Sequence, residues 1–243
     1  MKLDILAIGV HPDDVELGCS GTLINELKNG KNVGIVDLTQ GELGTRGTID
    51  TRYQEAASAA MIMGIHVREN LKMRDGFFEN DEVNKIKLIT AIRKYQPDIV
   101  IGNVLHDRHP DHGRAGKMIA DCCFLAGLSK IETKDENGND QQRWRPAYVL
   151  HYIQDWYHEP DLLIDISDVF DQRMKAIEAY STQFNSSNSD EPQTYISTPD
   201  FLESVIARAR MFGKRIGVKY AEGFISEKKI GIRTLDALIQ NET

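Results

Sequence analysis

Residues 3–14 read LDILAIGVHPDD, an apolar run followed at once by one histidine and two aspartates. The apolar part, residues 3–10, has the length and composition of a buried strand. Charged side chains are seldom placed against such a strand unless they are paired or carry a function. In a parallel sheet, ligands bind beyond the carboxyl ends of the strands, so this stretch predicts a parallel strand that leads into a polar site.

Strand-like and helix-like segments alternate after this stretch, which is typical of a largely parallel sheet covered by helices. Further strands are expected at residues 32–39, 68–73, 97–104, 147–153 and 161–167, and helices at residues 20–29, 50–64, 80–96, 113–127, 168–182 and 199–214. We expect the last two strands to form an antiparallel addition to the sheet edge. The order predicts an α/β fold that is Rossmann-like, with a mostly parallel twisted sheet and helices on both faces.

The length of the chain, 243 residues, suits one domain with a sizeable core. We expect a single domain over residues 1–243, in which the polar stretch 129–146 forms a mobile surface insertion. No apolar stretch approaches the ~20 residues of a membrane helix, and the N-terminus lacks the basic and apolar segments of a signal peptide. These features predict a cytoplasmic protein without a membrane partner.

The cysteines and the net charge narrow the class of protein further. Three cysteines, Cys19, Cys122 and Cys123, are an odd number, so a disulfide framework is not expected. Cys19 is expected to be a small core residue. The net charge of −8 argues against a nucleic-acid partner, because phosphate binding relies on an excess of lysine and arginine. A small molecule is the expected partner.

A second loop rich in histidine and aspartate follows the strand expected at 97–104 and reads HDRHPDH, residues 106–112. The carboxyl ends of parallel strands meet at one edge of the sheet, so this loop and the HPDD loop are expected to lie together. A catalytic zinc site uses three ligands from His, Asp and Glu and leaves a position for water. The candidates in the two loops are His11, Asp13, Asp14, His109, Asp111 and His112.

Each loop alone is also explained by a proline turn that ends in an aspartate helix cap. One metal site, in contrast, explains both loops together, so we predict a metal centre between them. The candidates that do not hold the metal are then expected to support it or to transfer protons.

Three arginines, Arg46, Arg52 and Arg108, lie in or beside loops that should face this site. Each is either a solvated surface residue or part of a clamp for a substrate carboxylate. The glycine-rich stretch GELGTRGT, residues 41–48, matches neither a dinucleotide-binding nor a phosphate-binding loop and is expected to form a flexible rim.

With HPDD after the first strand and HPDH after the fourth, the chain resembles the zinc-dependent PIG-L/LmbE family of N-acetylglucosamine deacetylases. The likeness spans nearly the whole chain. The stretches GVHPDDVELGCSGTL, TRGTIDTRYQEAASAAMIMGI, DRHPDHGRAGKM and MFGKRIGVKYAEGF together are similar to the branch that makes bacillithiol. The resemblance therefore implies an N-deacetylase whose substrate is N-acetylglucosaminyl malate and whose products are acetate and a free amine.

The resemblance also implies a set of metal ligands and a general base. The ligands fall on His11, Asp14 and His112, which would hold one divalent ion per chain, zinc in this family. Asp13 takes the role of the general base that draws a proton from the attacking water. Ligand type alone leaves iron open as the metal.

The same resemblance assigns roles to the other polar residues. His109 would stabilise the oxyanion and protonate the leaving amine, with Asp111 holding its ring. Arg52 would bind the sugar or its attached group, and Arg108 the malate carboxylate. Asp107 stands where some relatives carry a tyrosine that polarises the carbonyl, which leaves that role unfilled.

Two other functions stay open at this point. The chain could deacetylate another N-acetyl sugar, such as a chitooligosaccharide, or it could be a non-catalytic module in which zinc joins two loops. The resemblance further implies a homo-oligomer, in this branch often a hexamer.

Overall fold

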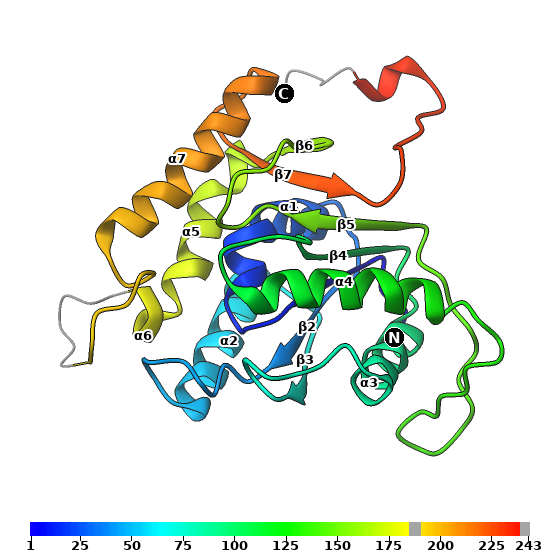
Figure 1. The fold of residues 1–243 in the computed structure, drawn as a ribbon. Helices are drawn as coiled ribbons and strands as arrows, with labels where there is room; N and C mark the ends of the chain where they lie inside the picture. The colour runs from blue at the N-terminus through cyan, green and yellow to red at the C-terminus, as the bar shows by residue number, and fades with distance from the viewer. Residues whose placement is uncertain (185–190, 239–243) are drawn as a thin grey trace.

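A seven-stranded sheet forms the centre of the protein (Figure 1), whose computed structural model describes residues 1–184 and 191–238. Its strands are β1 (Ile5–Gly9), β2 (Val33–Thr39), β3 (Val67–Met73), β4 (Ile99–Asn103), β5 (Tyr148–Tyr152), β6 (Leu162–Asp165) and β7 (Ala221–Ser226). They lie in the order β3-β2-β1-β4-β5-β7-β6. The first five of these are parallel, and β7 is antiparallel to both of its neighbours. The predicted Rossmann-like α/β fold is confirmed.

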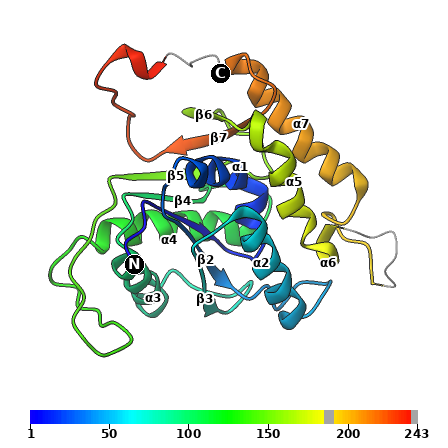
Figure 2. The ribbon, with the colours of Figure 1, turned by 180° about the vertical axis from the view of Figure 1, so that it is seen from behind.

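Helices cover both faces of the sheet (Figures 1 and 2). They are α1 (Asp14–Lys28), α2 (Ile49–Met63), α3 (Glu82–Tyr95), α4 (Pro110–Leu125), α5 (Phe170–Glu178), α6 (Ser181–Phe184) and α7 (Pro199–Ile216). One large apolar cluster joins α3 and α4 to the sheet, and a second joins α1, α5 and α7 to its other face. The sheet is thus the middle layer of three.

Strand β1 contributes to both apolar clusters, which explains its unbroken apolar sequence. Leu6 and Ile8 belong to the cluster beneath α3 and α4, whereas Ile5 and Ala7 belong to the cluster beneath α1. All five residues of β1 are buried. A strand that is covered by helices on both faces has no solvent-exposed face, so its side chains are apolar on both sides. This agrees with the buried strand that the opening stretch of the sequence predicts.

The chain reverses its direction of travel across the sheet between β1 and β4. From β1 it runs to β2 and β3 on one side, and β4 and β5 lie on the other side. Neighbouring loops diverge at such a point and leave a crevice beyond the carboxyl ends of the strands. The loops after β1 and β4 are the two that carry histidine and aspartate, so the topology places both at this crevice.

The structure differs from the sequence-based expectation at the sheet edge. Strand β5 is parallel to β4, and the antiparallel strand is β7, which lies between β5 and β6. No strand is predicted from the sequence at 221–226, because Glu222 interrupts its apolar pattern. The Glu222 carboxylate is buried and accepts hydrogen bonds from the backbone N–H groups of Gly21 and Thr22 and from Arg173.

The first helix also begins earlier than expected. Helix α1 starts at Asp14 rather than at residue 20, so its first turns contain the charged residues of the HPDDVELG stretch. Those side chains are buried rather than solvated, and distant parts of the chain supply their partners. The buried carboxylate of Glu16, for example, accepts a hydrogen bond of 2.6 Å from Arg68 on β3.

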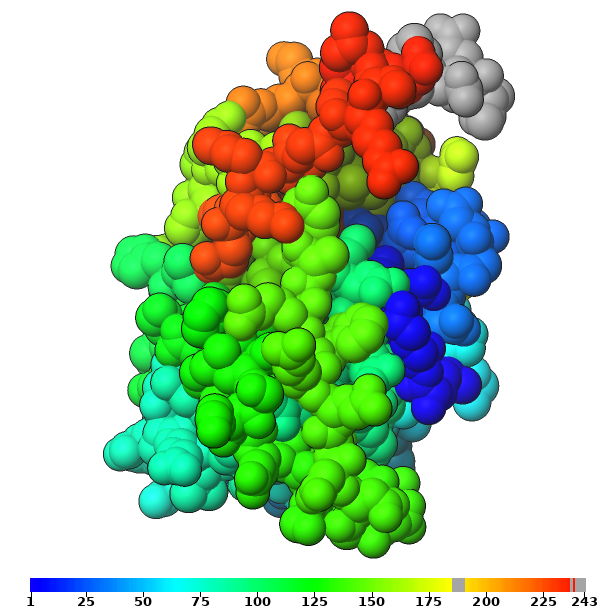
Figure 3. Space-filling view, turned by 90° about the vertical axis from the view of Figure 1, so that its right-hand side faces the viewer, coloured from blue at the N-terminus to red at the C-terminus, as the bar shows by residue number. Residues whose placement is uncertain are grey.

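The surface segments follow the sequence prediction more closely. The 129–146 insertion lies on the surface, where Trp144 donates from Nε1 to the carbonyl of Pro97 at 2.7 Å. Its mobility stays a prediction. After β7 the chain runs over the surface to a short turn at Leu235–Leu238 (Figure 3). The three cysteines are free and buried, which includes the core position expected for Cys19. In the described ranges, none of the helices is both long enough and apolar enough to span a membrane.

Removing Arg68 is expected to destabilise the fold, because Arg68 also pairs with both oxygens of Asp37, at 2.8 and 2.9 Å. Arg68→Ala leaves two buried carboxylates without their cation and should lower the free energy of unfolding by about 3–5 kcal/mol. Urea denaturation measures this. Lys94→Ala, which removes a half-exposed pair with Glu69, is the control and should cost less than about 1 kcal/mol. A similarly small cost for Arg68→Ala would contradict the role of this network.

Candidate active site

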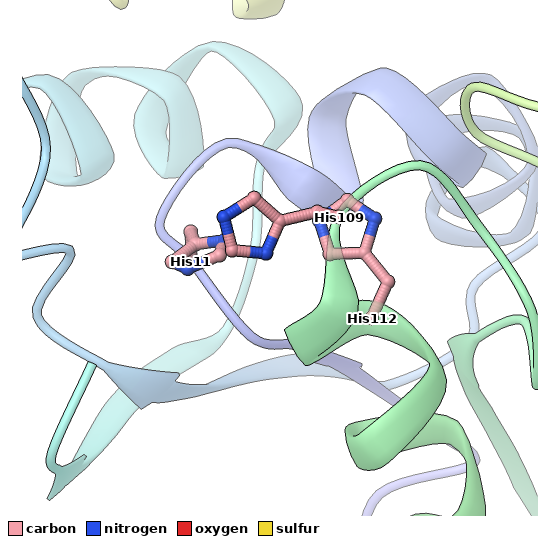
Figure 4. A group of neighbouring side chains, drawn as sticks. All are labelled: His11, His109 and His112. Carbon is pink, nitrogen blue, oxygen red and sulfur yellow. The ribbon is translucent and has the colours of Figure 1, made fainter. Parts of the chain in front are cut away.

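A cavity of about 410 Å³ lies beyond the carboxyl ends of the parallel strands. Loops that follow all five parallel strands contribute to its lining, through residues such as His11, Leu43, Asp75, His109 and Gln154. The HPDD and HPDH loops meet here: the ring centroids of His11 and His109 are 4.8 Å apart. Figure 4 shows the imidazoles of His11, His109 and His112 gathered between the loop after β1 and the start of α4.

The buried carboxylate of Asp14 occupies the centre of the site. One oxygen accepts hydrogen bonds from the backbone N–H groups of Val10 and His11, at 3.0 and 3.1 Å, and from the side chain of Asn103. The other oxygen accepts a hydrogen bond of 2.7 Å from Gln154. Burial acts to raise the pKa of Asp14, but the facing histidines and these donors hold the pKa well below its usual value.

Two histidines face the Asp14 carboxylate from different loops. Nδ1 of His11 lies 3.7 Å from one oxygen, and Nε2 of His112 lies 3.3 Å from the other. The second nitrogen of each ring contacts another carboxylate: His11 contacts Asp75 at 2.9 Å, and His112 contacts Asp107 at 2.8 Å. Metal-binding histidines characteristically donate their second N–H group to a carboxylate in this way, which orients the ring and makes it a better ligand.

Two groups of side chains around this carboxylate could hold a metal ion: His11, His109 and His112, and His11, Asp75 and Asp111. Ligand atoms about 2.1 Å from a tetrahedral zinc ion lie roughly 3.4 Å from one another, close to the separations of Asp14 from His11 and His112. Ring nitrogens of His11, His109 and His112 also lie within 4.8 Å of one another. Burial acts to lower the pKa of His112, but Asp14 and Asp107 raise it to about 10, so the two carboxylates favour positive charge at this ring.

Asp13 lies beside these groups in an unusual backbone conformation, with φ 136° and ψ −21° at the N-cap of α1. Its carboxylate is 3.3 Å from Arg52, which also donates to the carbonyl of Pro12 at 2.8 Å. Burial raises the pKa of Asp13 to about 7, although the Arg52 charge opposes this rise. A strained, buried carboxyl group that titrates near neutrality is typical of a functional residue.

His109 caps helix α4 rather than bonding to the Asp111 side chain. Its Nδ1 accepts the backbone N–H of Asp111 at 3.3 Å. The Asp111 carboxylate instead accepts hydrogen bonds from the Gly76 N–H, at 2.8 Å, and from Arg114, at 2.7 Å, because the first turn of α4 directs it toward the loop after β3. Burial and the charges of His11 and His112 lower the pKa of His109.

The three candidate arginines have different surroundings. Arg52 and Arg108 both line the cavity. Arg108 donates from Nε to Asp155 at 2.7 Å, and its guanidinium lies over the ring of Tyr195. Arg46 is 2% exposed and donates to the backbone carbonyl of Thr182 at 2.7 Å, with further bonds to the carbonyls of residues 191 and 192. Arg46 therefore links the 41–48 stretch to residues 182 and 191–192 of the same chain, and it does not line the cavity.

Several site residues are not identified from the sequence. They are Asp75, Asn103, Gln154 and Asp155. Each lies at the carboxyl end of a strand or within a few residues of it, and this position is the signal that could have found them. None of these four residues belongs to the HPDD or HPDH motif, so no local sequence pattern identifies them. Asp107, which stands where some relatives carry a tyrosine, contacts His112 and orients its ring.

Comparison with known proteins identifies several similar chains. The family model described as PIG-L, GlcNAc-PI de-N-acetylase, matches residues 6–123. The chain is 28% identical to diacetylchitobiose deacetylase of Thermococcus kodakarensis, over 90% of this chain and 81% of that protein. It is also 28% identical to the probable N-acetyl-alpha-D-glucosaminyl L-malate deacetylase 2 of Bacillus subtilis, over 75% of this chain and 84% of that protein.

The chain is also similar to a solved structure in both sequence and fold. The crystal structure of the conserved protein TT1542 from Thermus thermophilus superposes with a TM-score of 0.84. Its sequence is 34% identical, and the match covers 95% of this chain and 97% of that one.

The ligand assignment predicts how two substitutions change metal binding. His112→Ala removes a ligand and should abolish stoichiometric binding of Zn²⁺, measured by metal analysis after dialysis. Asp107→Asn keeps the ligand but removes the group that orients it, and should weaken Zn²⁺ affinity about 10- to 100-fold.

Glu227→Gln is the matched control, because Glu227 pairs at 2.9 Å with His151, which does not line the cavity. This variant should bind Zn²⁺ as the parent does. Full Zn²⁺ occupancy of His112→Ala would contradict the assignment.

Proposed function

The chain belongs to the PIG-L family, and on that premise we propose that it is a metal-dependent hydrolase that removes the N-acetyl group from an N-acetylglucosamine conjugate. The observation that carries the proposal is the convergence of His11, Asp14 and His112 beside Asp13 in one cavity. Three ligands from two loops leave room for a water molecule, whereas a structural zinc site is usually closed by four protein ligands.

We propose that His11, Asp14 and His112 hold the metal, with zinc as the expected ion and iron as the alternative. When bound, the ion supplies Lewis acidity to the attacking water and to the acetyl carbonyl. Asp75 and Asp107 keep the rings of His11 and His112 in place through their second nitrogens.

Asp13 acts as the general base in this proposal. A base is most effective when its pKa lies near the working pH, and burial raises the pKa of Asp13 to about 7. Arg52 holds the Asp13 carboxylate from one side and fixes its direction. The proton that Asp13 takes from water is then available for the leaving amine.

His109 stabilises the oxyanion that forms on the acetyl group. Because Nδ1 accepts the Asp111 N–H, the neutral ring carries its proton on Nε2 and donates from that atom. The lowered pKa keeps the ring neutral near pH 7, so a proton for the amine comes from Asp13 rather than from an imidazolium. This modifies the role that resemblance implies for His109.

Two conjugates are candidate substrates. The resemblance to the bacillithiol branch favours N-acetylglucosaminyl malate, and the relative from Bacillus subtilis supports it. The relative from Thermococcus kodakarensis supports a neutral chitooligosaccharide. The homo-oligomeric state and the cytoplasmic location stay predictions.

Replacing the base without removing a ligand tests the proposal. Asp13→Asn should retain stoichiometric Zn²⁺ and lower kcat/KM for acetate release by about 10²- to 10⁴-fold, because the amide cannot accept the proton. Metal analysis and an acetate assay on the same sample measure both quantities. Loss of the metal in this variant would refute the separation of roles between Asp13 and Asp14.

The pH profile gives a second test. Asp13 works only in its deprotonated form, so kcat/KM should fall as the pH falls through the Asp13 pKa, about 7 without metal. A bound cation favours the carboxylate and places this acid limb at or below that value. The residual activity of Asp13→Asn should lack the limb. A parent activity that rises as the pH drops from about 7 to about 5 would exclude Asp13 as the base.

A further inference from the structure

The charged residues that line the cavity are almost all paired with one another. Arg52 contacts Asp13, and Arg108 contacts Asp155, so each lining arginine already has a carboxylate partner. Among the described residues, five aspartates and these two arginines leave the lining with a formal charge of −3 when the histidines are neutral. A divalent ion would bring this charge to −1. The cavity therefore offers no excess cation to an acidic substrate.

The pair between Arg108 and Asp155 is built into a small cluster. The Nε–Oδ2 distance is 2.7 Å, and the side chains are 36% and 13% exposed. Tyr195 donates from its hydroxyl group to the second oxygen of Asp155 at 3.1 Å, and its ring lies 4.2 Å from the Arg108 guanidinium. Asp155 thus uses both oxygens to hold Arg108 and Tyr195 at the edge of the cavity.

This cluster presents donors and acceptors side by side. In the parts of the chain that are described, Nε is the only guanidinium nitrogen of Arg108 with a hydrogen-bond partner, so the terminal N–H groups remain available. The adjacent Asp155 carboxylate has lone pairs that can accept from hydroxyl groups. A sugar hydroxyl both donates and accepts, and it carries no charge. A carboxylate in the same place would meet Arg108 but also the like charge of Asp155.

Resting on the proposed deacetylase function, we infer that Asp155 determines substrate specificity: it neutralises the charge of Arg108, so the site takes a conjugate with an uncharged second group, such as another sugar, and disfavours one that carries carboxylates. The assignment of Arg108 as a malate clamp is thereby replaced. Asp155 acts here through Arg108 and through direct contact with the second group.

The test compares kcat/KM for N-acetylglucosaminyl malate and for N,N′-diacetylchitobiose in the Zn²⁺-loaded protein. The parent should prefer diacetylchitobiose. Asp155→Asn removes the negative charge at nearly constant shape, so the ratio of malate to chitobiose activity should rise by at least about tenfold. Glu159→Gln is the charge-matched control on the same loop: Glu159 pairs with Arg215 and does not line the cavity, so the ratio should stay within about twofold of the parent ratio.

Two results would overturn the inference while the proposed function stands. One is a parent protein that prefers the malate conjugate, and the other is an Asp155→Asn protein with an unchanged ratio. The ratio of malate to chitobiose activity in the parent protein tests the inferred preference even if the Asp155→Asn variant does not fold. Absence of acetate release from both conjugates and from free N-acetylglucosamine would instead refute the deacetylase function, and the inference with it.

Discussion

The carboxylate of Asp14 is the group on which the rest of the site depends. It is buried at the start of α1, where an uncompensated charge would be costly, and it stays ionised because neutral donors and histidines from three loops surround it. Asn103 reaches it from the end of β4 and Gln154 from the loop after β5. The same contacts that stabilise this charge therefore bring separate loops together and direct His11 and His112 toward one point.

A second layer of carboxylates extends this arrangement. Asp75 and Asp107 contact the outer nitrogens of His11 and His112, the two proposed ligand histidines, Asp155 contacts Arg108, and Arg52 contacts Asp13. Both arginines of the cavity and the histidines His11 and His112 thus each have an acidic partner that fixes their orientation. The excess of negative charge that results suits a divalent cation and an uncharged substrate. One electrostatic pattern therefore underlies the proposed metal centre, the proposed base and the inferred specificity.

The alternation of strands and helices and the two His/Asp loops could be predicted from the sequence because both are local patterns. The early start of α1, strand β7 and the ligand-orienting Asp75 could not, because each depends on distant partners. No local pattern predicts that Glu16 and Glu222 are buried, and they pair with Arg68 and Arg173, which are distant in the sequence. Likewise, the sequence leaves Arg108 open as a surface residue or a carboxylate clamp, and only the fold shows that it pairs with Asp155.

The most direct test of the account is acetate release from N,N′-diacetylchitobiose by protein that has been stripped of metal with a chelator and then titrated with Zn²⁺. The account predicts no release from the stripped protein and a return of activity in proportion to added Zn²⁺, complete at one ion per chain. Undiminished acetate release from the metal-free protein, or Zn²⁺-loaded protein that releases no acetate from any N-acetylglucosamine conjugate, would contradict it.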